Sequence, residues 1–214
     1  MRIRFDEQLK QLNKEMINMG TMIEKSIGDA VKALMKQDVE LAQKVMAGDE
    51  EINRTERKIE DLCLRLLLQQ QPVARDLRNI SAALKMVTDM ERIGDHATDI
   101  SELAIVLSEK KYVKKLDHIE EMARETMVML IQSLEAYVEK DLDKAQKVIA
   151  HDDVIDDLFE EVKQELIELI RNHADEGEQA VDLLMVTKYF ERIGDHATNI
   201  AEWVIFSITG QIAG

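Results

Sequence analysis

The sequence predicts an all-α protein made of two tandem, pseudo-symmetric antiparallel three-helix bundles, with six long helices in total. First, its 214 residues include one proline, eight glycines and 4% aromatic residues, which leaves few residues that form turns or favour strands. Second, apolar residues recur at steps of three and four, the periodicity of an amphipathic helix. Third, the second half of the chain repeats motifs of the first half.

The first long helix is expected over residues 5–34. Its apolar positions fall on one side of a helix: Phe5, Leu9, Leu12, Met16, Met19, Ile23 and Ile27. Asp38 stands where an N-cap is expected and begins the second helix, because its carboxylate can accept a hydrogen bond from a free backbone N–H. The second helix is expected to run to the glutamines at 69–71, and Pro72 marks its end.

The third helix is expected over residues 73–107. Four apolar residues there have helical spacing: Leu77, Ile80, Leu84 and Val87. The lysine-rich segment 110–115 then reads as a connector. Three long helices with short joints imply an antiparallel bundle.

The chain repeats this pattern in its second half. The tetrapeptide Ala-Gln-Lys-Val at 42–45 recurs at 145–148, an offset of 103 residues, and Asp38 and Asp49 return as Asp141 and Asp152. The octapeptide Glu-Arg-Ile-Gly-Asp-His-Ala-Thr at 91–98 recurs at 191–198, an offset of 100. We expect the difference of three residues to lie in the joint between the second and third helices. The repeat predicts one bundle over residues 1–109 and a second over 110–214.

Composition narrows the possible partners and the compartment. There are 28 basic and 43 acidic residues, and the net charge of −15 disfavours direct contact with nucleic acid or anionic lipid. The single cysteine, Cys63, excludes a disulfide within the chain and fits a reducing compartment. The N-terminal residues lack the apolar core of a secretory signal, and the longest apolar stretch, 62–68, is far shorter than the roughly 20 residues that span a bilayer. We therefore expect a cytoplasmic protein without membrane insertion.

The octapeptides carry acids on one side of a helix. At about 100° per residue, one narrow sector contains Glu91, Asp95, Thr98, Asp99 and Glu102, and the second copy places Glu191, Asp195, Thr198, Asn199 and Glu202 in the same way. Ionised carboxylates one turn apart repel each other by a few tenths of a kcal/mol, and a bound cation reverses that repulsion. Oxygen-only ligands suit magnesium, manganese, iron and, less often, zinc.

The second helix of each half adds further acids. Asp49 and Asn53 lie one turn apart, with Glu56 and Glu60 beyond them, and Asp152 and Asp156 occupy the corresponding positions in the second half. Antiparallel packing would bring these residues to the octapeptide faces. A lone acidic pair usually belongs to a solvated helix surface, but the duplication favours a metal site in each half. The candidate ligands are Glu91, Asp95, Asp99 and Asp49 in the first half and Glu191, Asp195, Asp152 and Asp156 in the second.

Other residues in and just after the octapeptides have expected supporting roles. Arg92 and Arg192 are expected to pair with the aspartates three residues later, or else to meet a partner. Glu102, Glu202 and Asn199 are candidates for partner contacts or for support of the ligands. Gly94 and Gly194 lie mid-helix, where glycine costs about 1 kcal/mol, and close approach of a neighbouring helix is the expected reason, with room for a ligand as the alternative. The histidines at 96 and 196 are expected to flank the acids.

The duplicated octapeptide in two tandem three-helix units resembles the PhoU family of phosphate-transport regulators over nearly the whole chain. The acidic motif of that family is similar to Glu91 with Asp95, to Glu191 with Asp195, and to Asp152 with Asp156. Asn53 replaces the second acid in the remaining pair, so the first-half site is expected to be weaker or differently composed.

The resemblance implies a capacity for iron or zinc at these faces. It also implies a role without chemistry of its own, which is to damp phosphate-starvation signalling between a phosphate ABC transporter and a membrane sensor histidine kinase. The implied partners are the transporter ATPase and that kinase.

Two other classes of function stay open from the residues alone. A carboxylate-bridged metalloenzyme of the ferritin type would use Glu-x-x-His on its helices, and the sequence contains neither that motif nor a phosphate-cradling glycine loop. A purely structural helical bundle would need only its apolar stripe, whereas here charged positions are duplicated as faithfully as apolar ones. The sequence leaves the identity of the metal open, and a homodimer is one of the assemblies it allows.

Overall fold

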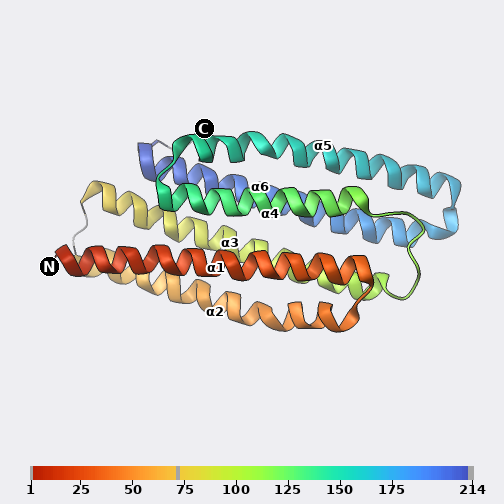
Figure 1. Cartoon of the computed structure of the whole chain (residues 1–214), viewed down its shortest axis with the longest axis horizontal. Helices are drawn as coiled ribbons and strands as arrows, with labels where there is room; N and C mark the ends of the chain where they lie inside the picture. The colour runs from red at the N-terminus through yellow and green to blue at the C-terminus, as the bar shows by residue number, and fades with distance from the viewer. Residues whose placement is uncertain (1, 71–72, 212–214) are drawn as a thin grey trace.

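The computed structural model describes residues 2–70 and 73–211, and side chains over 5–68 and 73–211. Over these ranges it contains six long helices and one short 3₁₀ helix: α1 (Arg2–Lys36), α2 (Val39–Gln70), α3 (Ala74–Leu107), α4 (Asp117–Glu139), α5 (Leu142–Asn172), η1 (Ala174–Glu176) and α6 (Gly177–Thr209) (Figure 1). The predicted all-α class with six long helices is confirmed. Within the described ranges, no helix has both the length and the apolar character needed to cross a membrane.

The six helices lie roughly along the long axis of the molecule, and helices that follow one another run in opposite directions (Figure 1). Helices α1 to α3 form one bundle and α4 to α6 form the other, with α2 and α5 at the outer edges. The most extensive contact between any two helices joins α3 to α6, and α1 also packs on α4. The two octapeptide helices therefore meet at the centre of the molecule.

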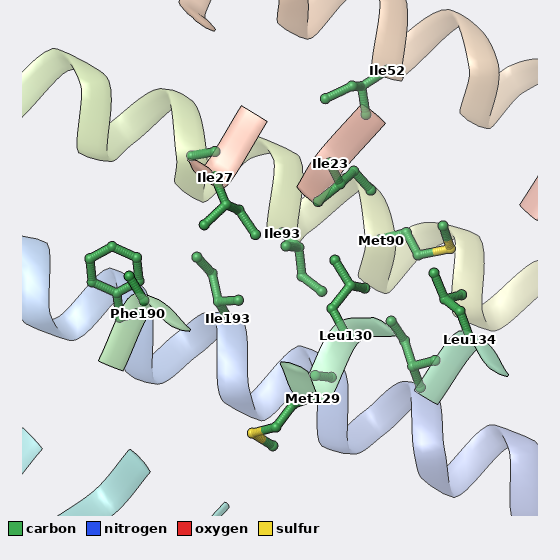
Figure 2. Packing of buried hydrophobic residues seen from close by; sticks show 14 of the residues in the cluster. Ile23, Ile27, Ile52, Met90, Ile93, Met129, Leu130, Leu134, Phe190 and Ile193 are labelled. Carbon is green, nitrogen blue, oxygen red and sulfur yellow. The ribbon is translucent and has the colours of Figure 1, made fainter. Parts of the chain in front are cut away.

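One continuous hydrophobic core runs through both bundles. Figure 2 shows side chains from four helices meeting there: Ile23 and Ile27 of α1, Met90 and Ile93 of α3, Leu130 and Leu134 of α4, and Phe190 and Ile193 of α6. Phe190 and Ile193 are fully buried. The apolar side of each octapeptide thus packs into a shared interior, which leaves its acidic side facing outward.

Helix ends repeat between the two halves. The carboxylates of Asp38 and Asp141 each accept a hydrogen bond from the backbone N–H three residues later, at 3.0 and 2.9 Å. The predicted N-cap at Asp38 is thereby confirmed. Gln37 and Lys140, one residue before these caps, both adopt the left-handed conformation, with φ of 54° and 58°. The repeat therefore extends to backbone conformation.

The difference in repeat offset does not lie where it was predicted. The joint at 71–73 is no longer than the joint at 173–176, and the extra residues lengthen the start of α3. Seventeen positions separate Ala74 from Glu91, whereas fourteen separate Gly177 from Glu191. The insertion is nearly one helical turn, so it lengthens the helix without rotating the later residues far from their face. Residues 71 and 72, including Pro72, lie outside the described part of the chain.

One predicted core residue is exposed. Ile80 and Val87 are buried in α3, but Leu77 keeps 45% of its surface accessible to solvent. Leu77 lies in the first turn of α3, and the buried residues of this helix begin only at Ile80. The apolar side of α3 therefore extends beyond the end of the hydrophobic core.

Candidate functional site

Two clusters of carboxylates lie where the second and third helices of each bundle meet. The first acidic face consists of Asp49 and Glu56 from α2 with Glu91 and Asp95 from α3, and the second acidic face consists of Asp152 and Asp156 from α5 with Glu191 and Asp195 from α6. Acids far apart in the sequence influence one another's pKa values across each face. The expected convergence of the two helices is therefore present in both halves.

Glycines allow this convergence. A Cβ atom added to Gly94 would lie 3.2 Å from Ile52 Cγ2, and one added to Gly194 would lie 3.2 Å from Asp152 Oδ1. Such distances are too short for a side chain to fit without displacement of its neighbours. Close approach of the neighbouring helix, the expected reason for mid-helix glycine, is confirmed at both positions.

The first acidic face concentrates negative charge in a partly buried place. Burial, followed by the charge of Glu91, raises the pKa of Glu56 to about 7. Burial, followed by the charge of Asp95, raises the pKa of both Asp49 and Glu91. Desolvation and like charge both disfavour the ionised form, so this face takes up protons more readily than isolated carboxylates do.

The second acidic face behaves in a similar way. Burial, followed by the charges of Asp195 and Asp156, raises the pKa of Asp152 to about 6. Burial, followed by the charge of Glu191, raises the pKa of Asp195. Both faces would therefore gain stability from any added positive charge.

Several oxygen atoms at the faces are buried without a hydrogen bond of good geometry. Among them are Asp49 Oδ1, Asn53 Oδ1 and the hydroxyl oxygens of Thr98 and Thr198. The Thr98 hydroxyl nevertheless lies near enough to Asp49 to lower its pKa, and Asn53 Nδ2 donates to the other Asp49 oxygen at 2.8 Å. Buried polar atoms normally have partners, so these oxygens are available to a ligand that accepts electron pairs.

The donor set at both faces fits a hard or borderline cation. It consists of carboxylate, amide and hydroxyl oxygens, which suit magnesium, manganese and iron, and zinc less well. In the described part of the chain, no three His, Cys, Asp or Glu side chains are already gathered closely enough to hold an ion. Binding would therefore require carboxylates to rotate toward a common point.

The two faces differ in their positive charges. Arg92 Nη1 donates to Asp95 Oδ2 at 3.0 Å, as predicted. The corresponding prediction for Arg192 is wrong, because no ion pair joins it to Asp195 among the described side chains. Lys188, one turn earlier on α6, instead pairs with Glu191.

An aromatic residue accompanies this lysine. Phe159 of α5 takes the position that Glu56 has in α2, at the offset of 103, and the Lys188 ammonium lies 5.3 Å from the centre of its ring. The second face therefore has a lysine and an aromatic ring where the first face has a carboxylate. The first face has Asn53 where the second face has Asp156, and Glu56 where the second face has Phe159. The two faces therefore differ in composition, as expected.

The histidines lie off the acidic faces, at the seam between α3 and α6. The rings of His96 and His196 are 5.6 Å apart, and the His96 ring is 5.4 Å from that of Tyr189. The Nδ1 atom of His196 lies 2.8 Å from Asp89 Oδ1, which also accepts a hydrogen bond from Asn199 Nδ2 at 3.1 Å. These residues join the two bundles to each other.

Asp99, which was predicted to join the ligands of the first face, and Asn199 turn toward this seam instead. Asp99 Oδ2 lies 3.1 Å from His96 Nδ1, although the charge of Asp99 still contributes to the raised pKa of Asp49. Asn199 reaches across to the other bundle and takes no part in the second acidic face. Glu102 is exposed, whereas Glu202 borders a separate hollow beside Trp203.

Sequence reasoning missed the roles of Lys188 and Phe159. Lys188 had a readable signal, since it precedes Glu191 by three residues and therefore lies beside it on the helix. The repeat offset of 103 aligns Phe159 with Glu56, but only the approach of α5 to α6 decides that its side chain reaches the face.

A family model described as the PhoU domain matches this chain twice, over residues 16–104 and over residues 119–204. The chain belongs to the PhoU family. The two matches fall one in each bundle, so the structural repeat is also the repeat of the family.

Proteins of this family resemble the chain over nearly its whole length. The phosphate-specific transport system accessory protein PhoU homolog of Clostridium acetobutylicum is 40% identical over 208 residues, which covers 97% of this chain and 95% of that protein. The phosphate-specific transport system accessory protein PhoU of Escherichia coli K12 is 30% identical, with 97% and 86% covered.

Solved PhoU structures have the same architecture. The crystal structure of PhoU from Pseudomonas aeruginosa has a TM-score of 0.92 and 34% identity, and the match covers 97% of this chain and 100% of that one. The crystal structure of the phosphate transport system regulatory protein PhoU from Streptococcus pneumoniae has a TM-score of 0.90 and 26% identity, covering 98% and 99%. The predicted family and its two-repeat helical fold are both confirmed.

Proposed function

We propose that this chain is a cytoplasmic, non-enzymatic accessory protein of a phosphate-specific transport system. The observation that carries the proposal is full-length similarity to relatives that bear this description, at up to 40% identity among those compared. Their names describe accessory and regulatory roles and give no support to the metalloenzyme alternative. Regulation rather than chemistry is the function that this similarity supports best.

The finer part of the proposal concerns partners. The protein acts as an adaptor that contacts the ATPase of the phosphate transporter and a sensor histidine kinase, and so lowers signalling when phosphate is plentiful. Its outer helices α2 and α5 lie at opposite edges of one continuous core, which suits simultaneous contact with two proteins. No nucleic acid takes part, since the net charge of −15 repels phosphate backbones.

The acidic faces are proposed to bind divalent or trivalent metal ions. Asp49, Glu91 and Asp95 would supply carboxylates on the first face, with Glu56 beside them. Asp152, Asp156, Glu191 and Asp195 would supply them on the second. A bound ion would supply positive charge between two helices and would offset the burial and the like charges that raise the pKa of Glu56 and of Asp152. The carboxylates themselves would hold the ion in place and so link the two helices.

A quadruple variant tests the role of the metal. Glu91, Asp95, Glu191 and Asp195 are changed together to alanine, and metal retained after purification without chelator is measured by mass spectrometry. We expect unchanged helicity, loss of retained metal and impaired phosphate-dependent repression. The matched control changes four exposed acids away from the faces to alanine: Glu50, Asp61, Asp157 and Glu168. Normal repression by the quadruple variant would show that the acidic faces are not needed.

A pull-down experiment tests the partners separately. The chain is used to capture the transporter ATPase and the kinase from cells grown with high and with low phosphate. We expect both proteins to be retained, to an extent that changes with phosphate. If neither is retained under either condition, the adaptor role is wrong, whatever the outcome of the metal measurement.

A further inference from the structure

A hollow separate from the acidic faces lies at the seam between α3 and α6. It encloses about 270 Å³ and is lined by Asp89 of α3 and by Asn199, Glu202, Trp203 and Phe206 of α6. We call these five residues the aromatic hollow. Neither the metal proposal nor the partner proposal above uses it.

Two aromatic rings form one wall of the aromatic hollow. The rings of Trp203 and Phe206 are 5.7 Å apart and nearly perpendicular, at 88°. Both side chains are half-buried, and Trp203 is the single tryptophan of the chain. Only 4% of the residues are aromatic, so this pair is a local concentration of an otherwise scarce residue type.

The fold does not require aromatic residues at these positions. At the repeat offset of 100 residues, Trp203 and Phe206 correspond to Leu103 and Val106 on α3. The first bundle therefore packs the same part of its helix with aliphatic side chains. Tryptophan is enriched among the residues that dominate binding at protein interfaces. A binding role therefore explains the aromatic pair, whereas core packing does not.

Negative charge borders the rings. Glu202 makes no ion pair within the described ranges, so its carboxylate is free to accept hydrogen bonds. Asp89 uses its Oδ1 atom for His196 and Asn199, at 2.8 and 3.1 Å, which fixes the carboxylate in position beside the rings. An aromatic face next to carboxylates attracts cations both through the ring quadrupole and through charge.

The chain already places a cation of its own at this ring. The ammonium of Lys85 lies 6.0 Å from the centre of the Trp203 ring, at the outer limit of a cation–π interaction. The half-buried Trp203 ring is therefore receptive to positive charge. Lys85 would also compete with an incoming cation, and this competition provides a test.

We propose that the aromatic hollow binds an arginine side chain of a partner protein. A guanidinium group is planar, so it can stack on an indole ring while its N–H groups donate to neighbouring carboxylates. Lysine carries a compact, strongly hydrated ammonium and lacks the planar group that stacks on a ring. The net charge of −15 favours a basic partner segment and speaks against a second copy of this chain as the occupant.

The test uses the fluorescence of the single tryptophan. The full chain is titrated at physiological salt with the short peptide acetyl-Gly-Arg-Gly-amide, and with matched peptides that contain lysine or uncharged citrulline. We expect a saturable change in Trp203 emission with the arginine peptide, a weaker response to lysine and none to citrulline. No saturable change with arginine, or an equal change with citrulline, would overturn the proposal.

Variants separate this site from general attraction to an acidic protein. We expect Glu202→Gln to weaken arginine binding by about tenfold, the equivalent of about 1.4 kcal/mol. Glu102→Gln removes the same charge at the equivalent position beside Leu103 and should have no effect. Lys85→Met removes the competing cation and should tighten binding.

The remaining outcomes also decide the question. Equal weakening by Glu202→Gln and Glu102→Gln would mean that only net charge attracts the peptide, and the site would be rejected. Trp203→Leu should abolish binding. Because this variant has no tryptophan, NMR line broadening of the peptide measures its binding, and helicity confirms that it folds. A dependence of Trp203 emission on protein concentration without peptide would identify a second copy of the chain as the occupant instead.

Discussion

Replacing Glu56 with glutamine should stabilise the protein near neutral pH. Burial and the charge of Glu91 raise the pKa of Glu56 from 4.5 to about 7 in the folded state. Between these values the folded protein holds a proton that the unfolded chain releases, so this residue makes stability fall as pH rises from 4.5 to 7. Glutamine does not titrate and removes that loss.

The size of the effect follows from the difference between the two pKa values. At about 1.4 kcal/mol per pKa unit, the full difference corresponds to about 3 kcal/mol. Glu56 is only half-buried, and solvent screens its interaction with neighbouring charges, so we expect about 1–2 kcal/mol in the free energy of unfolding. The gain should be largest above pH 7 and should vanish toward pH 4, where both states are protonated.

Urea unfolding over this pH range, in the presence of a chelator, measures the effect. Glu50→Gln is the matched control, since Glu50 is exposed on the same helix and loses the same charge. A double-mutant cycle with Glu91→Gln should show coupling, because Glu91 is the leading charge that acts on Glu56. If Glu56→Gln and Glu50→Gln alter stability equally at every pH, the like-charge account of the first acidic face is wrong.

Three further predictions concern the scaffold. Gly48→Ala should raise the free energy of unfolding by about 0.5–1 kcal/mol, because no atom lies within 4 Å of the added Cβ. Gly94→Ala should lower the free energy of unfolding, because the added Cβ lies 3.2 Å from Ile52 Cγ2. Asp38→Ala and Asp141→Ala should each cost about 1 kcal/mol by removing an N-cap, measured by urea unfolding. Phe190→Ala should cost about 3–5 kcal/mol by leaving a cavity in the shared core, which a fall in Tm would reveal.

Much of the fold could be read from local pattern. The steps of three and four along residues 5–34 predicted α1, and Asp38 predicted the start of α2, because both signals depend on the geometry of a single helix. Leu77 shows where this reasoning ends. Periodicity places it on the apolar side of α3 but does not say how far the covering helices extend, and the structure leaves it exposed.

The candidate site was predictable to the same degree. Spacing alone placed Glu91 and Asp95 one turn apart, and the pairing of Arg92 with Asp95 followed from it. The same rule failed for Arg192, which has an equivalent sequence position but a different environment. Asn199 shows the same limit, because its amide meets Asp89 of the other bundle.

The sequence by itself determined the helices, the internal repeat and the side of each helix that carries acids, since these follow from about 3.6 residues per turn and from repetition. Only the tertiary structure decided which helices meet, and hence that Glu56 faces Glu91 and that the Lys188 ammonium lies over the Phe159 ring. The physical reason is that the rotation and approach of packed helices depend on the whole core. A residue's neighbours across a helix boundary are set by every side chain between them, and no local spacing contains that information.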